Sequence, residues 1–244
     1  MAARPDPYFT PATFKFLRAL ARNNRREWFH AHKTDYETHV RSPCLRLIDD
    51  LADPLRKISP EFVASSRKVG GSLFRIHRDT RFSGDKSPYK THVGMNFYHQ
   101  VTKATARGIG GTASLGRLDA PSFYLHVEPG ESFVGGGLWH PESATLKRIR
   151  DYLVDNPRTW KALTNDKTFR KFFELTGETL TRPPRGYNLA HELIADLKRK
   201  DFVAAASLSD EDLLRPDLLK VLVQRCGIMK PMIEYLCGAL ELEF

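Results

Sequence analysis

The chain has 244 residues, 41% of them apolar and 27% charged, and 38 Lys and Arg against 29 Asp and Glu give a formal net charge of +9. This composition is typical of globular proteins, no apolar run reaches the roughly 18 residues that span a bilayer, and the first residues, MAARPDPYF, carry no secretory or lipidation signal. With three cysteines, no Cys-x-x-Cys pair, no linker and no repeat, we expect one cytoplasmic domain over residues 1–244 without a disulfide framework or zinc finger.

Residues 10–60 are predicted to form amphipathic helices. Thr10-Pro11 is typical of a helix start, and Asn24 with Glu27 resembles a capping box for a second helix. A third helix should begin at Ser42-Pro43 and end at Asp53-Pro54. Short amphipathic helices bury their apolar stripes against another layer, so we expect these helices to pack on a sheet.

Residues 72–140 are predicted to supply that sheet. Leu73–Thr80 and about Lys90–Gln100 alternate apolar and polar residues around a turn at residues 83–88, and Ser122–Glu128 alternates again. A fourth strand over residues 132–139 is expected to be interrupted by Gly135-Gly136-Gly137. For this triplet we favour a bulge or a packing role over contacts between its amides and a ligand.

The alternation gives each strand one apolar and one polar face. Phe74 and Ile76 are predicted to face the core, with Arg75 and His77 opposite. Because antiparallel strands that share an apolar face also share the other face, the polar residues of three strands should meet on one surface. These residues are Arg75, His77, His92, Asn96, Tyr98, Tyr124, His126 and Glu128.

Residues 141–244 are predicted to be mainly helical. RPPRGY (Arg182–Tyr187) should be extended, because paired prolines oppose helix, and a helix should follow over Asn188–Lys200. We expect an edge strand over Phe202–Ala206 and a last helical region interrupted near Pro216 and Pro231. The fold class is therefore α+β: a central antiparallel sheet with helices from the N-terminal and C-terminal parts packed on one face.

The turn of the predicted hairpin is rich in basic residues. Arginine binds phosphate bidentately and lysine adds a point charge, so these residues form a candidate anion site. In an equally weighted alternative, Asp79 and Asp85 hold the same cations in internal ion pairs. The candidate ligand-binding residues are Arg75, Arg78, Arg81, Lys86, Lys90, Tyr98 and Tyr124. The net charge favours an anionic partner, and we expect a small phosphorylated ligand.

Catalysis is the nearest alternative function. His77, His92 and His126 could act as general acid and base on a phosphate ester, oriented by Glu128, while Arg75 stabilises an oxyanion. Two histidines and Glu128 would also suit Zn, Mn or Fe, but no His-Glu-x-x-His motif exists, so we assign no metal ligand and no specific cofactor.

Nucleic-acid binding is a further alternative, with bases stacked on Tyr98, Tyr124, Phe82 or Tyr89. The sequence contains no recognised nucleic-acid-binding module. A purely structural domain would explain the helices, but it would leave the concentration of His, Arg and Tyr on one sheet face unexplained.

Four motifs carry a resemblance to a known family. They are RDTRFSGDKSPYKTHVG (Arg78–Gly94), FYLHVEPGESFVGGGLW (Phe123–Trp139), RPPRGY and LKRKDFVA (Leu197–Ala204). Together they resemble a bacterial and fungal family filed as domain of unknown function 2461, over nearly the whole chain. The resemblance implies no substrate and no catalytic residues, so the roles given above come from the residues themselves.

Overall fold

A six-stranded antiparallel sheet lies at the centre of the structure, a computed structural model that describes residues 6–81, 84–102 and 120–244. The strand order is β1-β2-β3-β4-β6-β5. The strands are β1 (Phe62–Val63), β2 (Val93–His99), β3 (Ser122–Val127), β4 (Ser132–Leu138), β5 (Glu174–Thr176) and β6 (Phe202–Leu208). The predicted α+β class with a central antiparallel sheet is confirmed.

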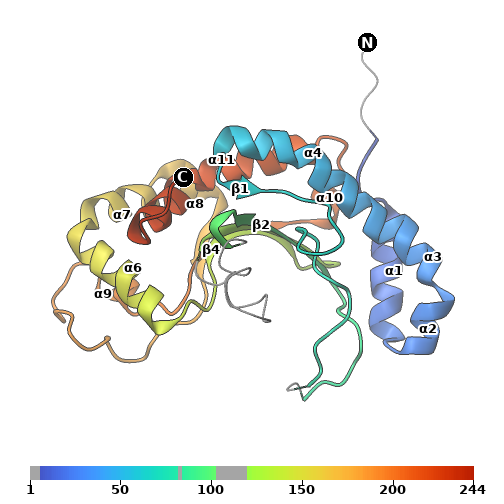
Figure 1. Cartoon of the computed structure of the whole chain (residues 1–244), viewed down its shortest axis with the longest axis horizontal. Coiled ribbons are helices and arrows are strands. Elements are labelled where there is room, and N and C mark those ends of the chain that lie inside the picture. Colours follow the sequence, from blue (N-terminus) through green and yellow to red (C-terminus); the bar gives the residue numbers. More distant parts are fainter. Residues whose placement is uncertain (1–5, 82–83, 103–119) are drawn as a thin grey trace, which may run out of the picture.

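Helices precede and follow the central strands, and Figure 1 shows them at both ends of the sheet and across one of its faces. The N-terminal helices are α1 (Pro11–Arg22), α2 (Arg26–Ala31), α3 (Lys33–Tyr36), the π-helix η1 (Glu37–Arg41) and α4 (Ser42–Ile58). The later helices are α6 (Ser143–Asp155), α7 (Pro157–Thr164), α8 (Lys167–Phe172), α9 (Ile194–Leu197), α10 (Asp210–Leu213) and α11 (Leu218–Ala239). Within the described ranges, no helix combines the length and the apolar character needed to cross a bilayer.

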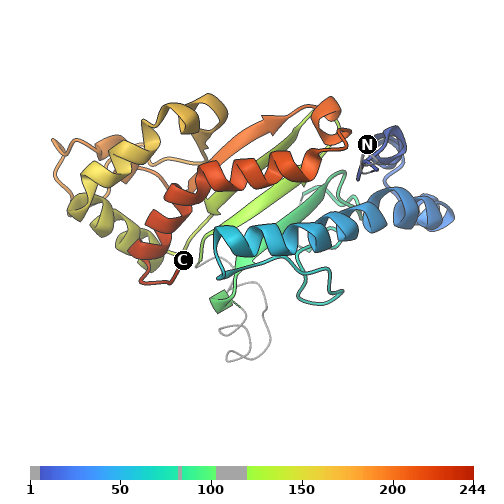
Figure 2. The ribbon, with the colours of Figure 1, turned by 90° about the horizontal axis from the view of Figure 1, so that it is seen from above.

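The two longest helices, α4 and α11, lie side by side across one face of the sheet (Figure 2). α4 buries Leu47 and Leu51 completely, and α11 buries Met229 and Ile233 in the same core. Phe123 in the middle strand β3 is also fully buried. Helices from both parts of the chain therefore cover one face, as predicted, and this packing fixes the opposite face as the place for polar residues.

Both long helices continue through a proline, which corrects two predicted breaks. α4 runs past Pro54 to Ile58, and α11 runs past Pro231 to Ala239. A proline removes one helical hydrogen bond, but in both helices the buried stripe resumes directly after it, at Leu55 and at Met232. Tertiary burial therefore outweighs the local preference for a helix end.

The glycine triplet lies inside an uninterrupted β4, contrary to the predicted break. Gly136 pairs with Phe123 on one side and with Ala204 on the other. A Cβ atom at Gly136 would stand 2.5 Å from Met229 Sδ, so the glycine lets α11 approach the sheet closely. The packing role favoured from the sequence explains this position.

The sheet extends beyond the predicted range of residues 72–140. β6 was expected at the edge, but it lies between β4 and β5, which is the edge strand. The predicted helix over residues 188–200 is reduced to the single turn of α9. A run of alternating, largely buried residues in β6 explains the inner position, because both sides of the strand are paired.

The three cysteines are free and buried, as expected from their number and spacing. Burial raises the pKa of Cys44 and of Cys226 to about 12. These thiols therefore stay protonated at neutral pH and behave as small apolar side chains.

Candidate functional site

The hairpin arm, defined as residues 73–90, projects from the sheet on the side opposite α4 and α11 (Figure 1). Phe82 and Ser83 lie outside the described residues. The two segments of the arm pair with each other in antiparallel fashion, as the predicted strand, turn and strand should, but through one isolated bridge rather than a continuous ladder.

A bulge separates the hairpin arm from β2. Leu73 forms a bridge with Met95, and His77 forms the next bridge with Tyr89. Three residues lie between these bridges on the first segment and five on the second. The two extra residues stand within Thr91–Val93, and such a bulge re-aims the side chains that it carries.

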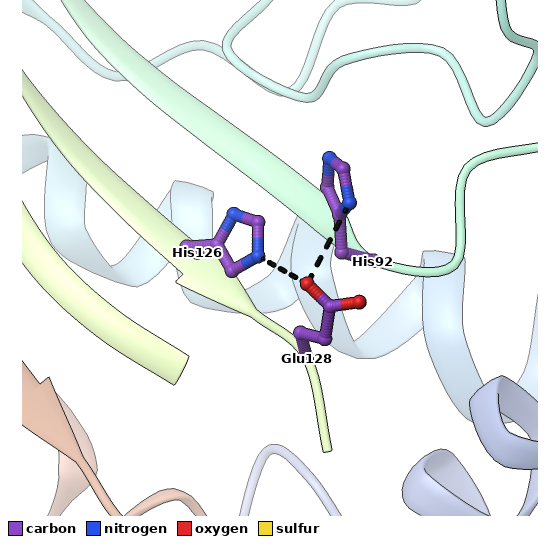
Figure 3. Close-up of side chains that lie close together, drawn as sticks. All are labelled: His92, His126 and Glu128. Atoms are coloured by element: carbon purple, nitrogen blue, oxygen red, sulfur yellow. Dashed lines mark hydrogen bonds and ion pairs between the residues drawn. The ribbon is translucent and has the colours of Figure 1, made fainter. Parts of the chain in front are cut away.

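Three side chains converge where β2 begins and β3 ends, and we call His92, His126 and Glu128 the His–Glu cluster (Figure 3). β2 and β3 pair Gly94 with His126, so two residues along each strand His92 comes to face Glu128. His126 Nε2 lies 2.9 Å from Glu128 Oε2, and His92 Nδ1 lies 3.8 Å from the same oxygen. One ligand atom from each residue lies within 4.8 Å of the others, so the cluster could hold a metal ion.

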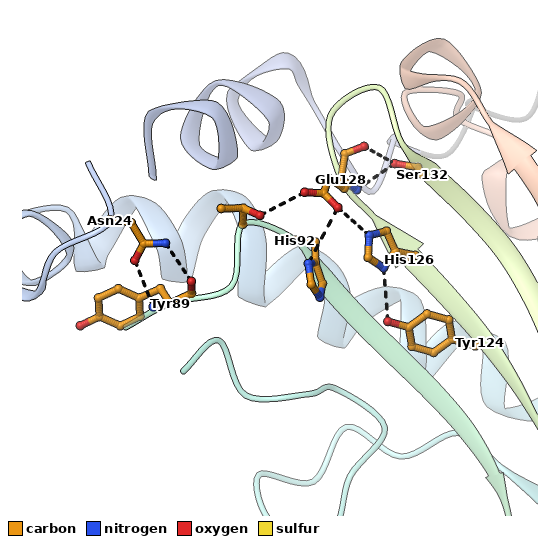
Figure 4. A network of polar contacts seen from close by, with 8 residues as sticks. Asn24, Tyr89, His92, Tyr124, His126, Glu128 and Ser132 are labelled. Carbon is orange, nitrogen blue, oxygen red and sulfur yellow. Dashed lines mark hydrogen bonds and ion pairs between the residues drawn. The ribbon is translucent and has the colours of Figure 1, made fainter. Parts of the chain in front are cut away.

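Neighbouring hydroxyl groups fix the orientation of this cluster (Figure 4). Thr91 Oγ1 donates a hydrogen bond of 3.0 Å to Glu128 Oε1, the oxygen that faces away from the histidines. Tyr124 Oη lies 3.3 Å from His126 Nδ1. The hydroxyl of Ser132 donates to the Glu128 carbonyl and accepts from its amide, which holds the backbone at the end of β3.

The protonation states in the cluster follow from burial and from neighbouring charges. Burial, and then His126, lowers the pKa of His92 to about 4. Burial raises the pKa of Glu128, but hydrogen bonds from His126 and Thr91 outweigh it and the net shift is downward. Burial raises the pKa of Tyr124 to about 12. At neutral pH the cluster therefore combines a carboxylate, a neutral His92 and a protonated phenol.

A second site, which we call the basic cavity, lies between the start of α2 and the hairpin arm. It has a volume of about 400 Å³. Its lining residues are Asn24, Arg25, Arg26, His77, Arg78, Thr80, Lys86 and Pro88. No acidic residue of the described chain is among them. The cavity joins the two densest basic segments of the sequence, which are separated by some fifty positions.

Asn24 connects these two segments. Its side-chain amide donates a 2.8 Å hydrogen bond to the Tyr89 carbonyl, and its oxygen accepts one of 3.0 Å from the Tyr89 amide (Figure 4). The side chain thus pairs with the hairpin arm as a neighbouring strand would. Asn24 was predicted to cap the second helix, but Arg25 occupies the N-cap position of α2.

Ion pairs stiffen the tip of the hairpin arm, as the structural alternative expected. Arg81 binds Asp79 through two nitrogens, at 3.0 and 2.7 Å, and Arg78 pairs with Asp85. Lys86 Nζ donates to the Thr80 carbonyl at 2.9 Å. These contacts leave Arg78 and Lys86 able to contact a ligand as well, because both side chains also line the basic cavity.

Several of the predicted site residues lie apart from the His–Glu cluster. His77 packs against the rings of Phe29 and Tyr89 and lines the basic cavity. Arg75 is exposed on the hairpin arm. Tyr98 is buried and donates to the Gly70 carbonyl, which makes it a structural residue of the sheet.

The polar face of the sheet is closed along part of its length, which the alternation did not predict. Asn96 and Tyr98 are 8% and 1% exposed. Phe74, predicted to face the core, contacts the Tyr124 ring on the polar side instead, and Lys90 Nζ lies 5.2 Å from the centre of the Phe74 ring. Within the described residues, the polar face is therefore closed around Asn96 and Tyr98, and the His–Glu cluster lies at the end where β2 begins and β3 ends.

A comparison with known protein families assigns the chain. A sequence model described as conserved hypothetical protein (DUF2461) matches residues 12–235. The chain belongs to the DUF2461 family. Among the curated proteins and the solved structures, no match to it was found. The resemblance inferred from the four motifs is confirmed, and each of those motifs lies within the matched residues of this DUF2461 chain.

Two features of the candidate sites in this DUF2461 chain were not predicted from the sequence. Arg25 and Arg26 line the basic cavity. The sequence shows a dense group of basic residues at this point, but it does not show that this group lies beside the hairpin arm. Thr91 orients Glu128 from within the bulge, and nothing in the alternation indicated that role. The pattern Asn-Asn-Arg-Arg before a helix was the available signal, since it adds an amide and two cations to one turn.

We expect His92 of the DUF2461 chain to stay neutral down to about pH 5 in buffer containing a chelator. Its pKa of about 4 lies below the value near 6.5 of an unfolded histidine. Between these values the unfolded chain takes up the proton first, so the folded state should lose stability as the pH falls from about 6.5 to 4. Histidine NMR titration measures the pKa of His92. Chemical unfolding at pH 7 and at pH 5 measures the loss of folding free energy between these pH values, which should be smaller for His92→Gln than for the wild type.

Proposed function

We propose that this protein binds a small phosphorylated ligand in the basic cavity. The observation that carries the proposal is the lining of that cavity, which contains four cationic side chains and, among the described residues, no acidic one. They are Arg25, Arg26, Arg78 and Lys86. Guanidinium groups grip phosphate oxygens in pairs, and a lysine adds charge, so this set suits a phosphate group.

Two of these arginines make no polar contact within the described residues that would give them a structural role. Within the described part of the chain, the guanidinium groups of Arg25 and Arg26 form no hydrogen bond and no ion pair, and both side chains are exposed. Arg78, by contrast, is held by Asp85 and by Ser87 Oγ at 3.0 Å. One fixed and two free guanidinium groups around one cavity resemble a site that is completed by its ligand.

The surrounding charges support an anionic ligand. Burial lowers the pKa of Lys90, and Arg75 and Arg78 lower it further by repulsion. Arg78 lines the basic cavity, whereas Lys90 and Arg75 lie outside its lining and add to the positive potential around it. The cavity volume of about 400 Å³ lies within the range of small-molecule sites. We place this function in the cytoplasm, because the cysteines are free thiols.

Calorimetric titration tests the proposal directly. Pyrophosphate, a sugar phosphate and a nucleoside monophosphate are titrated into the protein at physiological salt, with chloride and acetate as controls. We expect at least one phosphate compound to bind, and Arg25→Gln or Arg26→Gln to weaken its binding by about 10- to 150-fold each, because a charged hydrogen bond contributes about 1.5–3 kcal/mol. Both variants should keep the melting temperature of the wild type.

Arg158→Gln is the matched control, because Arg158 is an exposed arginine in α7, outside the cavity lining. It removes the same charge and should leave the affinity unchanged. Equal weakening by Arg158→Gln would mean that only the net charge acts. Binding of single-stranded oligonucleotides with steep salt dependence, and of no small phosphate, would instead favour the nucleic-acid alternative.

A further inference from the structure

We propose that the His–Glu cluster binds a divalent transition-metal ion, with His92, His126 and Glu128 as its protein ligands (Figure 3). The proposal uses none of the residues that line the basic cavity, so it does not depend on the phosphate ligand. No compact metal-binding motif marks this site, since His92 and His126 lie 34 positions apart and come together when β2 pairs with β3.

The distances within the cluster fit a coordination sphere. Ligand atoms about 2.1 Å from a tetrahedral ion lie roughly 3.4 Å from one another. Glu128 Oε2 lies 2.9 Å from His126 Nε2 and 3.8 Å from His92 Nδ1, which brackets that value. All three ligand atoms lie within 4.8 Å of one another, so side-chain adjustments of about an ångström would bring them around one ion.

A hydrogen-bonded pair alone does not explain the arrangement. It accounts for the contact between His126 and Glu128, but His92 stands beside them with its ring centre 4.4 Å from that of His126. Within the described residues, the His92 side chain makes no hydrogen bond, since its approach to Glu128 is too long for one. A cation shared by the two imidazoles and the carboxylate gives His92 a partner.

Two of the three proposed ligands already have supporting contacts of the kind found around metal sites. In such sites, histidine ligands hydrogen bond through the second ring nitrogen, and carboxylate ligands through the second oxygen. Tyr124 Oη contacts His126 Nδ1 at 3.3 Å, and Thr91 donates to Glu128 Oε1 at 3.0 Å. Both contacts leave His126 Nε2 and Glu128 Oε2 directed at the same point.

The choice of ion follows from the donor set. Two imidazoles and one carboxylate suit zinc, manganese or iron, whereas magnesium and calcium prefer oxygen ligands alone. The side chains of His92 and Glu128 are 31% and 25% exposed, so solvent reaches the cluster. Three protein ligands with an accessible side leave a position for water or an anion, as in catalytic rather than structural zinc sites.

Metal titration of the full-length protein tests this site. The protein is stripped of metal with a chelator, and zinc is titrated against a competing fluorescent indicator. Cobalt(II) is added to the metal-free protein, and its visible absorption reports an N- and O-coordinated site. We expect one zinc ion per chain, a higher melting temperature with zinc, and no comparable response to magnesium. His92→Ala and Glu128→Gln should each weaken zinc binding by about 100-fold or more.

Variants of the supporting residues and variants at residues elsewhere show whether zinc binds at the His–Glu cluster. Tyr124→Phe and Thr91→Val remove only the supporting contacts and should weaken zinc binding about tenfold. His30→Ala and Glu131→Gln change an exposed histidine and an exposed carboxylate elsewhere and should have no effect. Melting temperatures recorded without metal identify any variant that fails to fold. The remaining variants then test the proposed zinc site.

Two results would overturn the proposal. One is a wild type that binds zinc no more tightly than His92→Ala does. The other is equal weakening by His30→Ala, which would indicate scattered surface histidines. Absence of binding would leave acid–base chemistry by His126 and Glu128 as the use of the cluster. Because the basic cavity is tested with metal-free phosphate titrations, failure of one proposal is distinguishable from failure of the other.

Discussion

Replacing Gly137 by alanine is expected to lower the free energy of unfolding by about 3 kcal/mol or more. Gly137 has a φ of +124°, a conformation that side-chain-bearing residues rarely adopt. A Cβ atom there would stand 1.9 Å from the Phe202 carbonyl oxygen, which belongs to the backbone of β6 and cannot rotate away. Strand β4 would have to separate from β6, so chemical denaturation should show a large loss or no folded protein at all.

Gly227→Ala is the matched control for this prediction. Gly227 lies on an exposed side of α11, and a Cβ atom there would meet nothing within 4 Å. Alanine favours helix over glycine by about 0.5–1 kcal/mol, so this variant should be as stable as the wild type or slightly more stable. If Gly137→Ala behaved like Gly227→Ala, the close approach of β4 and β6 would be wrong.

Side-chain parity was sufficient to predict the His–Glu cluster. His92, His126 and Glu128 were assigned to one face from alternation alone, and the register of β2 with β3 brings them together. Parity works here because each side of a paired strand has a period of two that the ladder enforces. The prediction concerns position, and the role of these residues is a separate question, which the zinc titration addresses.

The same reasoning did not place His77, because a bulge intervenes. The two extra residues near Thr91 keep the parity but bend the hairpin arm away from the sheet. His77 pairs with Tyr89, three positions before His92, which is about 10 Å along an extended segment. Alternation specifies the face of a residue and carries no information on such insertions.

The basic cavity could not be predicted for a different reason. It depends on Asn24, whose side chain substitutes for a strand backbone against Tyr89. Local signals assigned Asn24 to helix capping, because an Asn followed by a Glu three residues later usually has that function. Asn24 contacts Tyr89 instead, which lies 65 positions away in the sequence, and rules for helix capping do not cover such a contact.

Replacing Asn24 by alanine is therefore expected to lower the free energy of unfolding by about 2–4 kcal/mol, because it leaves two backbone groups of Tyr89 without partners. Tyr89 is 2% exposed and its ring stacks on Phe29 at 4.1 Å, so water reaches these groups poorly. Asn23→Ala is the control: within the described residues, the Asn23 side chain donates only to the Ala19 carbonyl of the preceding helix, and its loss should cost less than about 1 kcal/mol.

The same substitution should also abolish phosphate binding, since α2 and the hairpin arm would no longer be held at the spacing that forms the basic cavity. Denaturant unfolding gives the stability, and pyrophosphate calorimetry gives the affinity. Asn24→Asp keeps the acceptor for the Tyr89 amide but loses the donor to its carbonyl, so its stability should be intermediate. Full phosphate affinity in a folded Asn24→Ala protein would show that the cavity does not depend on this contact, and the hairpin arm would then bind the anion by itself.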